Sequence, residues 1–120
     1  MKTQIIGNHA EGLAEAYLKK QGLLIRERNY RCKVGEIDII AQDKKDGVIF
    51  VEVRYRHSKD YGSAAETVIP TKQHKIMRTA EYYLNMNNLF EKVPCRFDVI
   101  AIDYTEKEDN IDWIKDAFQN

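Results

Sequence analysis

Cysteine, proline and long apolar runs are scarce in this chain of 120 residues, and each scarcity excludes a class of protein. The two cysteines form no CxxC pair, and the three histidines lack the spacing of a zinc site. Two lone thiols in a cysteine-poor chain fit a reducing compartment. We see neither an apolar signal peptide nor a membrane span of about 20 apolar residues. We therefore expect a cytoplasmic protein that does not enter a membrane.

A net charge of one sign is also absent, because 19 basic side chains balance 19 acidic ones. The balance excludes a generically basic nucleic-acid coat protein and a strongly acidic solvating tail. The charges are unevenly distributed, however. Residues 1–102 carry 17 basic and 13 acidic side chains, whereas residues 103–120 carry 2 basic and 6 acidic side chains. A polyanion could find a positive face on the main body, although a merely solvated acidic end explains the same distribution.

Repeats, low-complexity tracts and linkers are missing too, so residues 1–120 are predicted to form one domain. Apolar residues at positions 10, 13, 14, 17 and 18 form the stripe of an amphipathic helix that ends near Gly22. Period-two alternation predicts strands over residues 36–41 and 48–56, which a polar turn joins into a hairpin.

The remaining segments complete an α/β sandwich. Residues 23–31 look extended, residues 57–70 form a polar surface loop, and Thr71 is expected to cap a second helix. Residues 97–102 are apolar on both faces, which predicts an inner strand, and residues 111–114 could add a short edge strand. The predicted order is helix, three strands, helix, strand and a short C-terminal element, with helices flanking a mixed sheet.

The predicted hairpin gathers charged residues on one face. With a loop at residues 44–46, Asp38 faces Glu52 and Glu36 faces Arg54 across the strands. The opposite face would carry the apolar residues Ile37, Ile39, Ala41, Ile49, Val51 and Val53. A slip by one residue would move carboxylates into this apolar layer, so the hydrophobic pattern opposes it.

Two carboxylates directly opposed across a strand pair repel each other. A hard divalent cation such as Mg²⁺ would remove the repulsion, because it binds through one or two carboxylates together with waters and phosphate oxygens. The alternative is a wet face whose carboxylates are neutralised by Arg54 and Arg56. Ile40 and Phe50 lie among the charges and would partly cover the face, which favours a site.

Three segments resemble the YraN family: residues 35–40 (GEIDII), 51–56 (VEVRYR) and 96–100 (RFDVI). The likeness extends to residues 10–18, 61–62 and 111–118 and so covers nearly the whole chain. That family in turn resembles the restriction-endonuclease-like superfamily, which includes archaeal Holliday-junction resolvases. The resemblance implies a restriction-endonuclease-like core, whose element order is the one that the periodicity predicts.

The resemblance also implies an active site in which an acid precedes a (D/E)xK motif. Asp38 matches the first carboxylate and Glu52 the second, while Glu36 is a candidate further ligand. Glu11 matches the helix-borne glutamate of resolvase-like members, although a solvated glutamate that favours the helix dipole explains it equally well. Arg54 stands where the motif has lysine. Arginine stays charged and cannot act as a general base, but it can orient water or stabilise charge on a phosphoryl group.

These residues lead to the hypothesis of a Mg²⁺- or Mn²⁺-dependent endonuclease that hydrolyses phosphodiester bonds in DNA, including branched or damaged DNA. A basic cluster could contact phosphates: Arg56, His57, Lys59, Lys72, Lys75 and Arg78. A solvated charged face is the simpler explanation of that cluster on its own. The alternatives are a nucleic-acid-binding module that has lost catalysis through the arginine at position 54, and a structural or adaptor protein. A homodimer would suit a junction substrate by analogy alone.

Overall fold

The computed structural model of the protein describes residues 2–57, 67–104 and 109–119. Its elements follow in the order α1 (Lys2–Lys20), β1 (Leu24–Cys32), β2 (Gly35–Asp43), β3 (Gly47–His57), α2 (Pro70–Met86), β4 (Cys95–Tyr104) and β5 (Asp109–Phe118). The strands form one sheet in the order β1-β2-β3-β4-β5, in which β3 and β4 are parallel and the other neighbours antiparallel. The prediction of an α/β protein with a mixed sheet flanked by helices is therefore confirmed.

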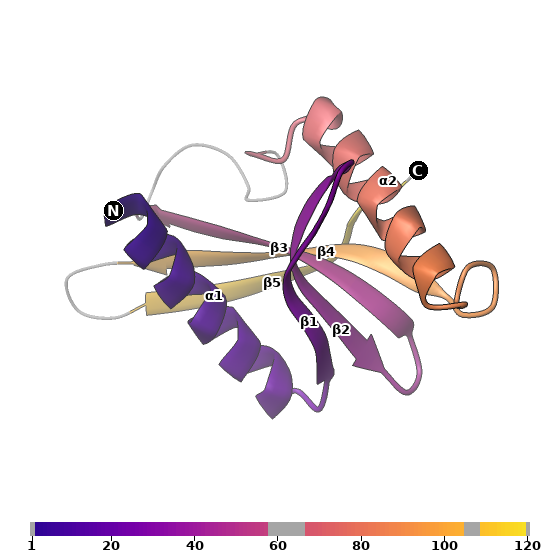
Figure 1. The fold of residues 1–120 in the computed structure, drawn as a ribbon. Coiled ribbons are helices and arrows are strands. Elements are labelled where there is room, and N and C mark those ends of the chain that lie inside the picture. The colour runs from indigo at the N-terminus through magenta and orange to yellow at the C-terminus, as the bar shows by residue number, and fades with distance from the viewer. Residues whose placement is uncertain (1, 58–66, 105–108, 120) are drawn as a thin grey trace.

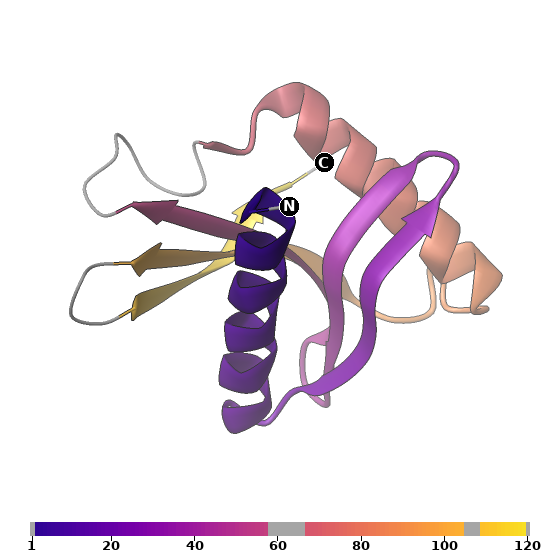
Figure 2. The same ribbon diagram turned by 60° about the vertical axis from the view of Figure 1, so that its left-hand side comes forward.

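The two helices cover opposite faces of the sheet (Figures 1 and 2), and an apolar core lies under each of them. The core under α1 contains Ala10, Ala14, Leu18, Ile39, Ala41, Ile49, Val51, Ile100 and Ile102. The core under α2 contains Ile37, Ile40, Val48, Phe50, Ile76, Ala80, Tyr83 and Val99. Full burial of one large aliphatic side chain contributes about 1.5–3 kcal/mol, so the helical stripes read from the sequence are sufficient to dock both helices.

Two elements differ from the sequence prediction. The short C-terminal element is a full strand, β5, which pairs antiparallel with β4 at the edge of the sheet. Thr71 was predicted to cap α2, but the cap residue is Ile69, which makes no side-chain capping bond. Pro70 begins the helix because its fixed φ suits the first turn, where its missing N–H would have no partner. Of the predicted loop at 57–70, residues 58–66 lie outside the described part of the chain.

The β2–β3 turn requires glycine at position 47. Gly47 has a φ of 78°, and a Cβ atom there would lie 2.1 Å from the carbonyl oxygen of Pro94. That same carbonyl accepts the Val48 N–H at 3.0 Å. The turn is therefore pressed against the start of β4, which fixes where the β2–β3 hairpin begins.

Strands β2 and β3 pair along only part of their length. Their register runs from Asp43 opposite Gly47 to Ile39 opposite Val51, as the alternation predicts. Beyond Ile39, β2 stays paired with β1, and both strands curve away from β3 (Figures 1 and 2). Ile37 therefore packs under α2, and the prediction that it shares a face with Ile39 is wrong. The twist of the sheet rotates β2 at the point where it leaves its neighbour.

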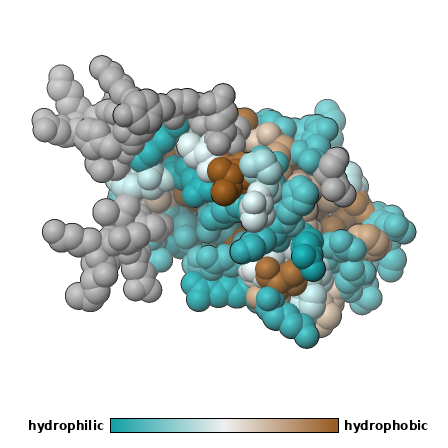
Figure 3. Space-filling model, turned by 90° about the horizontal axis from the view of Figure 1, so that it is seen from above, coloured by the Kyte–Doolittle hydropathy of each residue, from teal (hydrophilic) through white to brown (hydrophobic). Residues whose placement is uncertain are grey.

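The face seen from above α2 is mostly hydrophilic, and hydrophobic side chains appear on it only as small separate patches (Figure 3). Large apolar side chains that are exposed include Ile69 at the start of α2 and Met86 at its end. Among the described residues, neither helix is both long enough and apolar enough to cross a membrane.

Candidate active site

The candidate site lies where strands β2 and β3 stop pairing. It consists of Asp38 on β2 together with Glu52 and Val53 on β3, and we call this group of residues the fork. The side chain of Asp38 accepts the backbone N–H of Val53 at 2.8 Å through its Oδ2 atom. This bond lies just beyond Ile39, the last residue of β2 that pairs with β3 in the backbone ladder. A carboxylate thus takes the place of a strand carbonyl, which satisfies the N–H and holds Asp38 beside β3.

Asp38 and Glu52 form a carboxyl pair inside the fork. The Glu52 side chain is only 4% exposed, and the two carboxyl groups share a hydrogen bond. Burial, followed by the hydrogen bond and the negative charge of Glu52, raises the pKa of Asp38 to about 8, and the charge of Glu11 adds to the rise. The Val53 N–H opposes it. Two such groups cannot both ionise cheaply without a counter-charge, so the pair holds a proton at neutral pH.

Two cations from different elements approach Glu52. Lys72, in the first turn of α2, places its Nζ atom 2.8 Å from Glu52 Oε2. Arg54, on β3, places Nη2 at 3.6 Å from the same oxygen and also donates Nη2 to the carbonyl of Thr67 at 3.4 Å. The nearer cation is therefore Lys72, which the sequence placed in a surface cluster rather than beside the acids.

Glu11 borders the fork from α1 and is held by an arginine. Arg28 of β1 places Nε 3.7 Å from Glu11 Oε1 and Nη1 3.6 Å from Glu15 Oε2, while Nη2 donates to the carbonyl of Asn8 at 2.9 Å. Within the described residues, no group of three or more acidic, histidine or cysteine side chains is arranged to hold a metal ion. The predicted trio of Glu11, Asp38 and Glu52 is thus not assembled, and a role for Glu11 as a ligand would require it to leave Arg28.

Most buried polar atoms that lack a hydrogen bond belong to this site. Those found in the described part of the chain are Glu11 Oε1, Glu52 Oε2, Arg54 Nε and Arg96 Nη2. Lys72 pairs with the charge of Glu52 but lies off the hydrogen-bonding direction, so the oxygen accepts no bond. Buried oxygens without donors are unusual and can serve a cation. Because Mg²⁺ needs only one or two carboxylates besides water and phosphate, Asp38 and Glu52 fit such an ion without Glu11.

A profile of the family described as "Uncharacterised protein family UPF0102" matches residues 10–102. The chain belongs to the UPF0102 family. It is 42% identical to a UPF0102 protein of Nitrosococcus oceani over 113 residues, which cover 94% of this chain and 90% of the relative. It is 47% identical to relatives in Saccharophagus degradans (93% and 91% covered) and Herminiimonas arsenicoxydans (98% and 89%). The resemblance to YraN proteins is thereby confirmed.

The solved structures add little. A structure of Pyrococcus furiosus SfsA in complex with Ca²⁺ aligns with 94% of this chain and 63% of that chain. The TM-score is 0.37 and the sequence identity 15%. A similarity at this level supports no inference about the fold or the function of the UPF0102 chain.

Two other predicted site residues have different partners from those expected. Glu36 pairs with Arg31 at 3.0 Å near the β1–β2 turn and is mostly exposed. The prediction that Glu36 faces Arg54 is therefore wrong, because β2 pairs with β3 only from Ile39 onward and position 36 lies outside the paired segment. Arg56 binds the carboxylate of Asp103 on the neighbouring strand. Any contact between Arg56 and a phosphate must compete with this ion pair.

Two of the remaining predicted phosphate contacts line an open cavity of about 560 Å³ between α2 and the β1–β2 turn, whereas Arg78 is not part of its lining. Lys72 and Lys75 line it on the α2 side, and Arg31 lines it on the strand side. Gly35 lets the turn approach α2 closely, since a Cβ atom there would lie 2.8 Å from Thr79 Oγ1. Lys59 lies outside the described residues, as does the side chain of His57.

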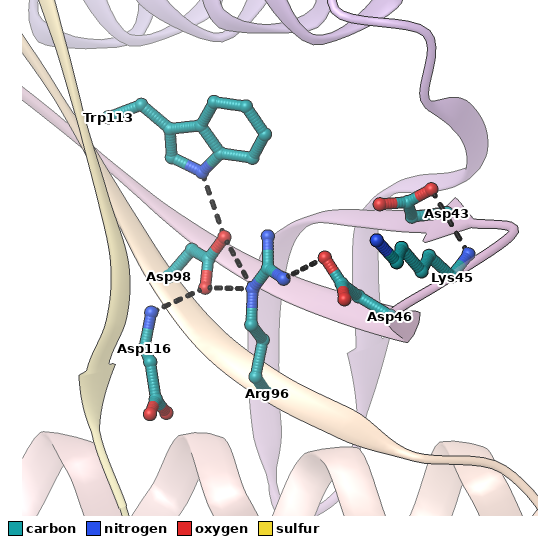
Figure 4. Close-up of polar contacts among 7 residues, drawn as sticks. All are labelled: Asp43, Lys45, Asp46, Arg96, Asp98, Trp113 and Asp116. Carbon is teal, nitrogen blue, oxygen red and sulfur yellow. Dashed lines mark hydrogen bonds and ion pairs between the residues drawn. The ribbon is translucent and has the colours of Figure 1, made fainter.

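A second polar centre surrounds Asp98 on β4 (Figure 4). This fully buried carboxylate accepts Arg96 Nε at 3.0 Å, Trp113 Nε1 at 2.8 Å and the Asp116 N–H at 2.9 Å. Arg96 also binds Asp46 on the β2–β3 turn. Asp98 is therefore a buried partner for an arginine. The network ties β4 to β5 and to the turn, which is a structural role.

Proposed function

We propose that this UPF0102 protein is a metal-dependent endonuclease of the restriction-endonuclease-like superfamily that hydrolyses phosphodiester bonds in DNA. The observation that carries the proposal is the pair of Asp38 and Glu52, buried together with their charges only partly compensated. The element order supports it, because α1, three antiparallel strands, α2 and a strand parallel to β3 follow the order that the resemblance implies. We propose Mg²⁺ or Mn²⁺ as the cofactor.

In this proposal Asp38 and Glu52 hold the cation. A bound divalent ion would polarise the phosphoryl group and lower the pKa of a bound water. The Val53 N–H keeps the Asp38 carboxylate aimed into the fork, which reduces the reorganisation needed when the cation binds. Arg54 adds positive charge beside Glu52, where the attacked phosphate would lie.

DNA is the proposed partner because the basic residues lie beside the acids. Lys72 and Lys75 extend from the fork along α2, where a phosphate backbone could run past the cavity. Branched or damaged DNA is the substrate class that we propose from the resemblance. A homodimer would present two such sites to a junction.

A binding module without catalysis is the second candidate, and two observations favour it. Arg54 replaces the lysine of the motif, and the Lys72 ammonium contacts the Glu52 oxygen that a metal would need. Such a module would bind DNA equally well in EDTA and would not respond to Mg²⁺.

The test compares cleavage of branched and linear DNA by the wild type and by Glu52→Gln, with Mg²⁺, Mn²⁺ or EDTA. Glu52→Gln keeps the size of the side chain but removes a charge that holds the metal. We expect cleavage that depends on metal and falls at least about 100-fold in the variant. Equal cleavage by the two proteins would assign the activity to another site or a contaminant, and the proposal would fail.

A further inference from the structure

Two cations, Arg54 and Lys72, lie near Glu52, and they differ in their surroundings and in their distance from its carboxylate. Arg54 is drawn toward the carbonyl of Thr67, and its Nε atom is buried without an acceptor in the described structure. The Lys72 side chain is 42% exposed, so its ammonium can reach both Glu52 and the open cavity beside α2. The more exposed of the two cations is therefore also the one nearer to Glu52.

The first turn of α2 fixes Lys72 at this place. The Gln73 side chain donates to the carbonyl of Val68 at 2.8 Å, and its backbone N–H donates to the carbonyl of Ile69 at 3.0 Å. Val68 is itself buried in the core under α2. The turn that carries Lys72 is thus anchored to the core, which places the lysine side chain between Glu52 and the cavity.

We propose that Lys72, rather than Arg54, is the catalytic cation of the active site. This inference rests on the proposed function. The Lys72 ammonium would donate hydrogen bonds to a non-bridging oxygen of the attacked phosphate. A water oxygen bonds to phosphorus as one phosphorus–oxygen ester bond breaks. The water releases a proton to solvent, and the leaving oxygen takes one from solvent. A lysine from α2 thereby supplies the charge that the motif otherwise takes from β3.

Lys75 provides a control that distinguishes a catalytic role of Lys72 from simple attraction of DNA. Lys75 lies one turn further along α2 and lines the same cavity. Lys72, unlike Lys75, pairs with a carboxylate of the fork. Both lysines should therefore attract the phosphate backbone, while only Lys72 should act on the phosphate that is cleaved.

The Glu52 contact gives a measurement that does not depend on cleavage. A divalent cation that binds Glu52 must displace or tolerate the Lys72 ammonium at 2.8 Å. Removing this ammonium should therefore tighten binding of Mn²⁺ in the absence of DNA, roughly two- to tenfold. Lys92→Ala, which removes one exposed lysine beyond the other end of α2, should leave Mn²⁺ affinity unchanged.

The experiment measures single-turnover cleavage at saturating DNA, DNA affinity in EDTA, and Mn²⁺ affinity by electron paramagnetic resonance. The proteins are the wild type, Lys72→Ala, Lys75→Ala and Lys92→Ala. We expect Lys72→Ala and Lys75→Ala to lose DNA affinity to a similar extent. Lys72→Ala should also lose about 100-fold in cleavage rate, at least about tenfold more than Lys75→Ala. Lys72→Met, which keeps the aliphatic stem, replaces Lys72→Ala if the latter does not fold.

The outcomes distinguish this inference from the proposed function. If the wild type cleaves and Lys72→Ala retains the rate of Lys75→Ala, Lys72 is not catalytic, while the nuclease assignment stands. Unchanged Mn²⁺ affinity in Lys72→Ala would also overturn the inference, because it would show that the ammonium does not compete with the cation for Glu52. If the wild type fails to cleave DNA both with Mg²⁺ and with Mn²⁺, the proposed function is overturned, and the inference that rests on it falls as well.

Discussion

The two buried carboxylate centres of this protein differ in how completely their charge is balanced. Asp98 receives donors from Arg96, Trp113 and the backbone of Asp116, so its oxygens are well satisfied. Asp38 instead faces the carboxyl group of Glu52, and burial together with this neighbour raises the pKa of Asp38 to about 8. A satisfied buried carboxylate stabilises a fold, whereas an opposed pair costs stability and is retained where a site needs it. The comparison indicates a structural role for the Asp98 network and supports the proposal that the fork is the active site.

The largest expected effect comes from breaking the satisfied centre. Asp98→Asn leaves the Arg96 guanidinium without its buried counter-charge, so the free energy of unfolding should fall by about 3 kcal/mol. Urea denaturation monitored by circular dichroism measures the change. A loss below about 1 kcal/mol would show that Asp46 alone can hold Arg96, and the two centres would then differ less than the structure implies.

The second prediction asks which centre attracts DNA. The double variant Lys72→Ala and Lys75→Ala removes two charges beside the fork, and it should reduce the slope of log affinity against log salt by about 1.8. The matched control, Lys44→Ala with Lys45→Ala, removes two exposed charges from the turn beside the Asp98 network (Figure 4) and should leave the slope unchanged. Equal slopes for the wild type and the first variant would remove Lys72 and Lys75 from the interface.

The third prediction concerns Asp38, where replacement by asparagine should raise the free energy of unfolding instead of lowering it. Since the pKa of Asp38 rises from 3.8 to about 8, the folded protein binds more protons than the unfolded chain between these values. Stability should therefore fall as pH rises from about 4 to about 8. Asp38→Asn keeps an acceptor for the Val53 N–H but removes the charge. It should stabilise the protein at pH 8 by at least about 1.4 kcal/mol and leave stability at pH 4 nearly unchanged.

Denaturation of both proteins across pH 4 to 9 provides the measurement. If Asp38→Asn is destabilised at pH 8, the Asp38 carboxylate is already compensated in the wild type, and the contrast with Asp98 disappears. Added Mn²⁺ should raise the melting temperature of the wild type at pH 8 more than that of Asp38→Asn, because a ligand that binds only the folded state stabilises it.

The hairpin and its acids could be predicted from the sequence because they depend on local patterns. Period-two alternation and the turn at Gly47 suffice to place Ile39 opposite Val51. The same pattern brings Asp38 and Glu52 together at the end of the paired segment. The helical stripes are local as well, which is why both helices were found.

Contacts that depend on where elements dock could not be predicted. The place where β2 leaves β3 decides that Ile37 changes face and that Glu36 pairs with Arg31 instead of Arg54. The Lys72–Glu52 contact requires α2 to pack on the opened end of the sheet, and nothing in a helical stripe specifies that position. Strand β5 was underestimated because its outer positions are polar and exposed, which weakens the period-two signal.

The smallest expected effect concerns Arg54, the residue that departs from the lysine motif. If Lys72 supplies the catalytic charge, Arg54→Lys should change the cleavage rate only a few-fold, and it should preserve or raise it because lysine matches the motif and also carries a removable proton. Cleavage assays of both proteins with Mg²⁺ and with Mn²⁺ measure the change. An inactive wild type beside an active Arg54→Lys would favour the degenerate binding module. Loss of a wild-type activity in Arg54→Lys would show that the planar guanidinium is needed for a bidentate phosphate contact. In that case the fork would depend on Arg54 as the Asp98 network depends on Arg96.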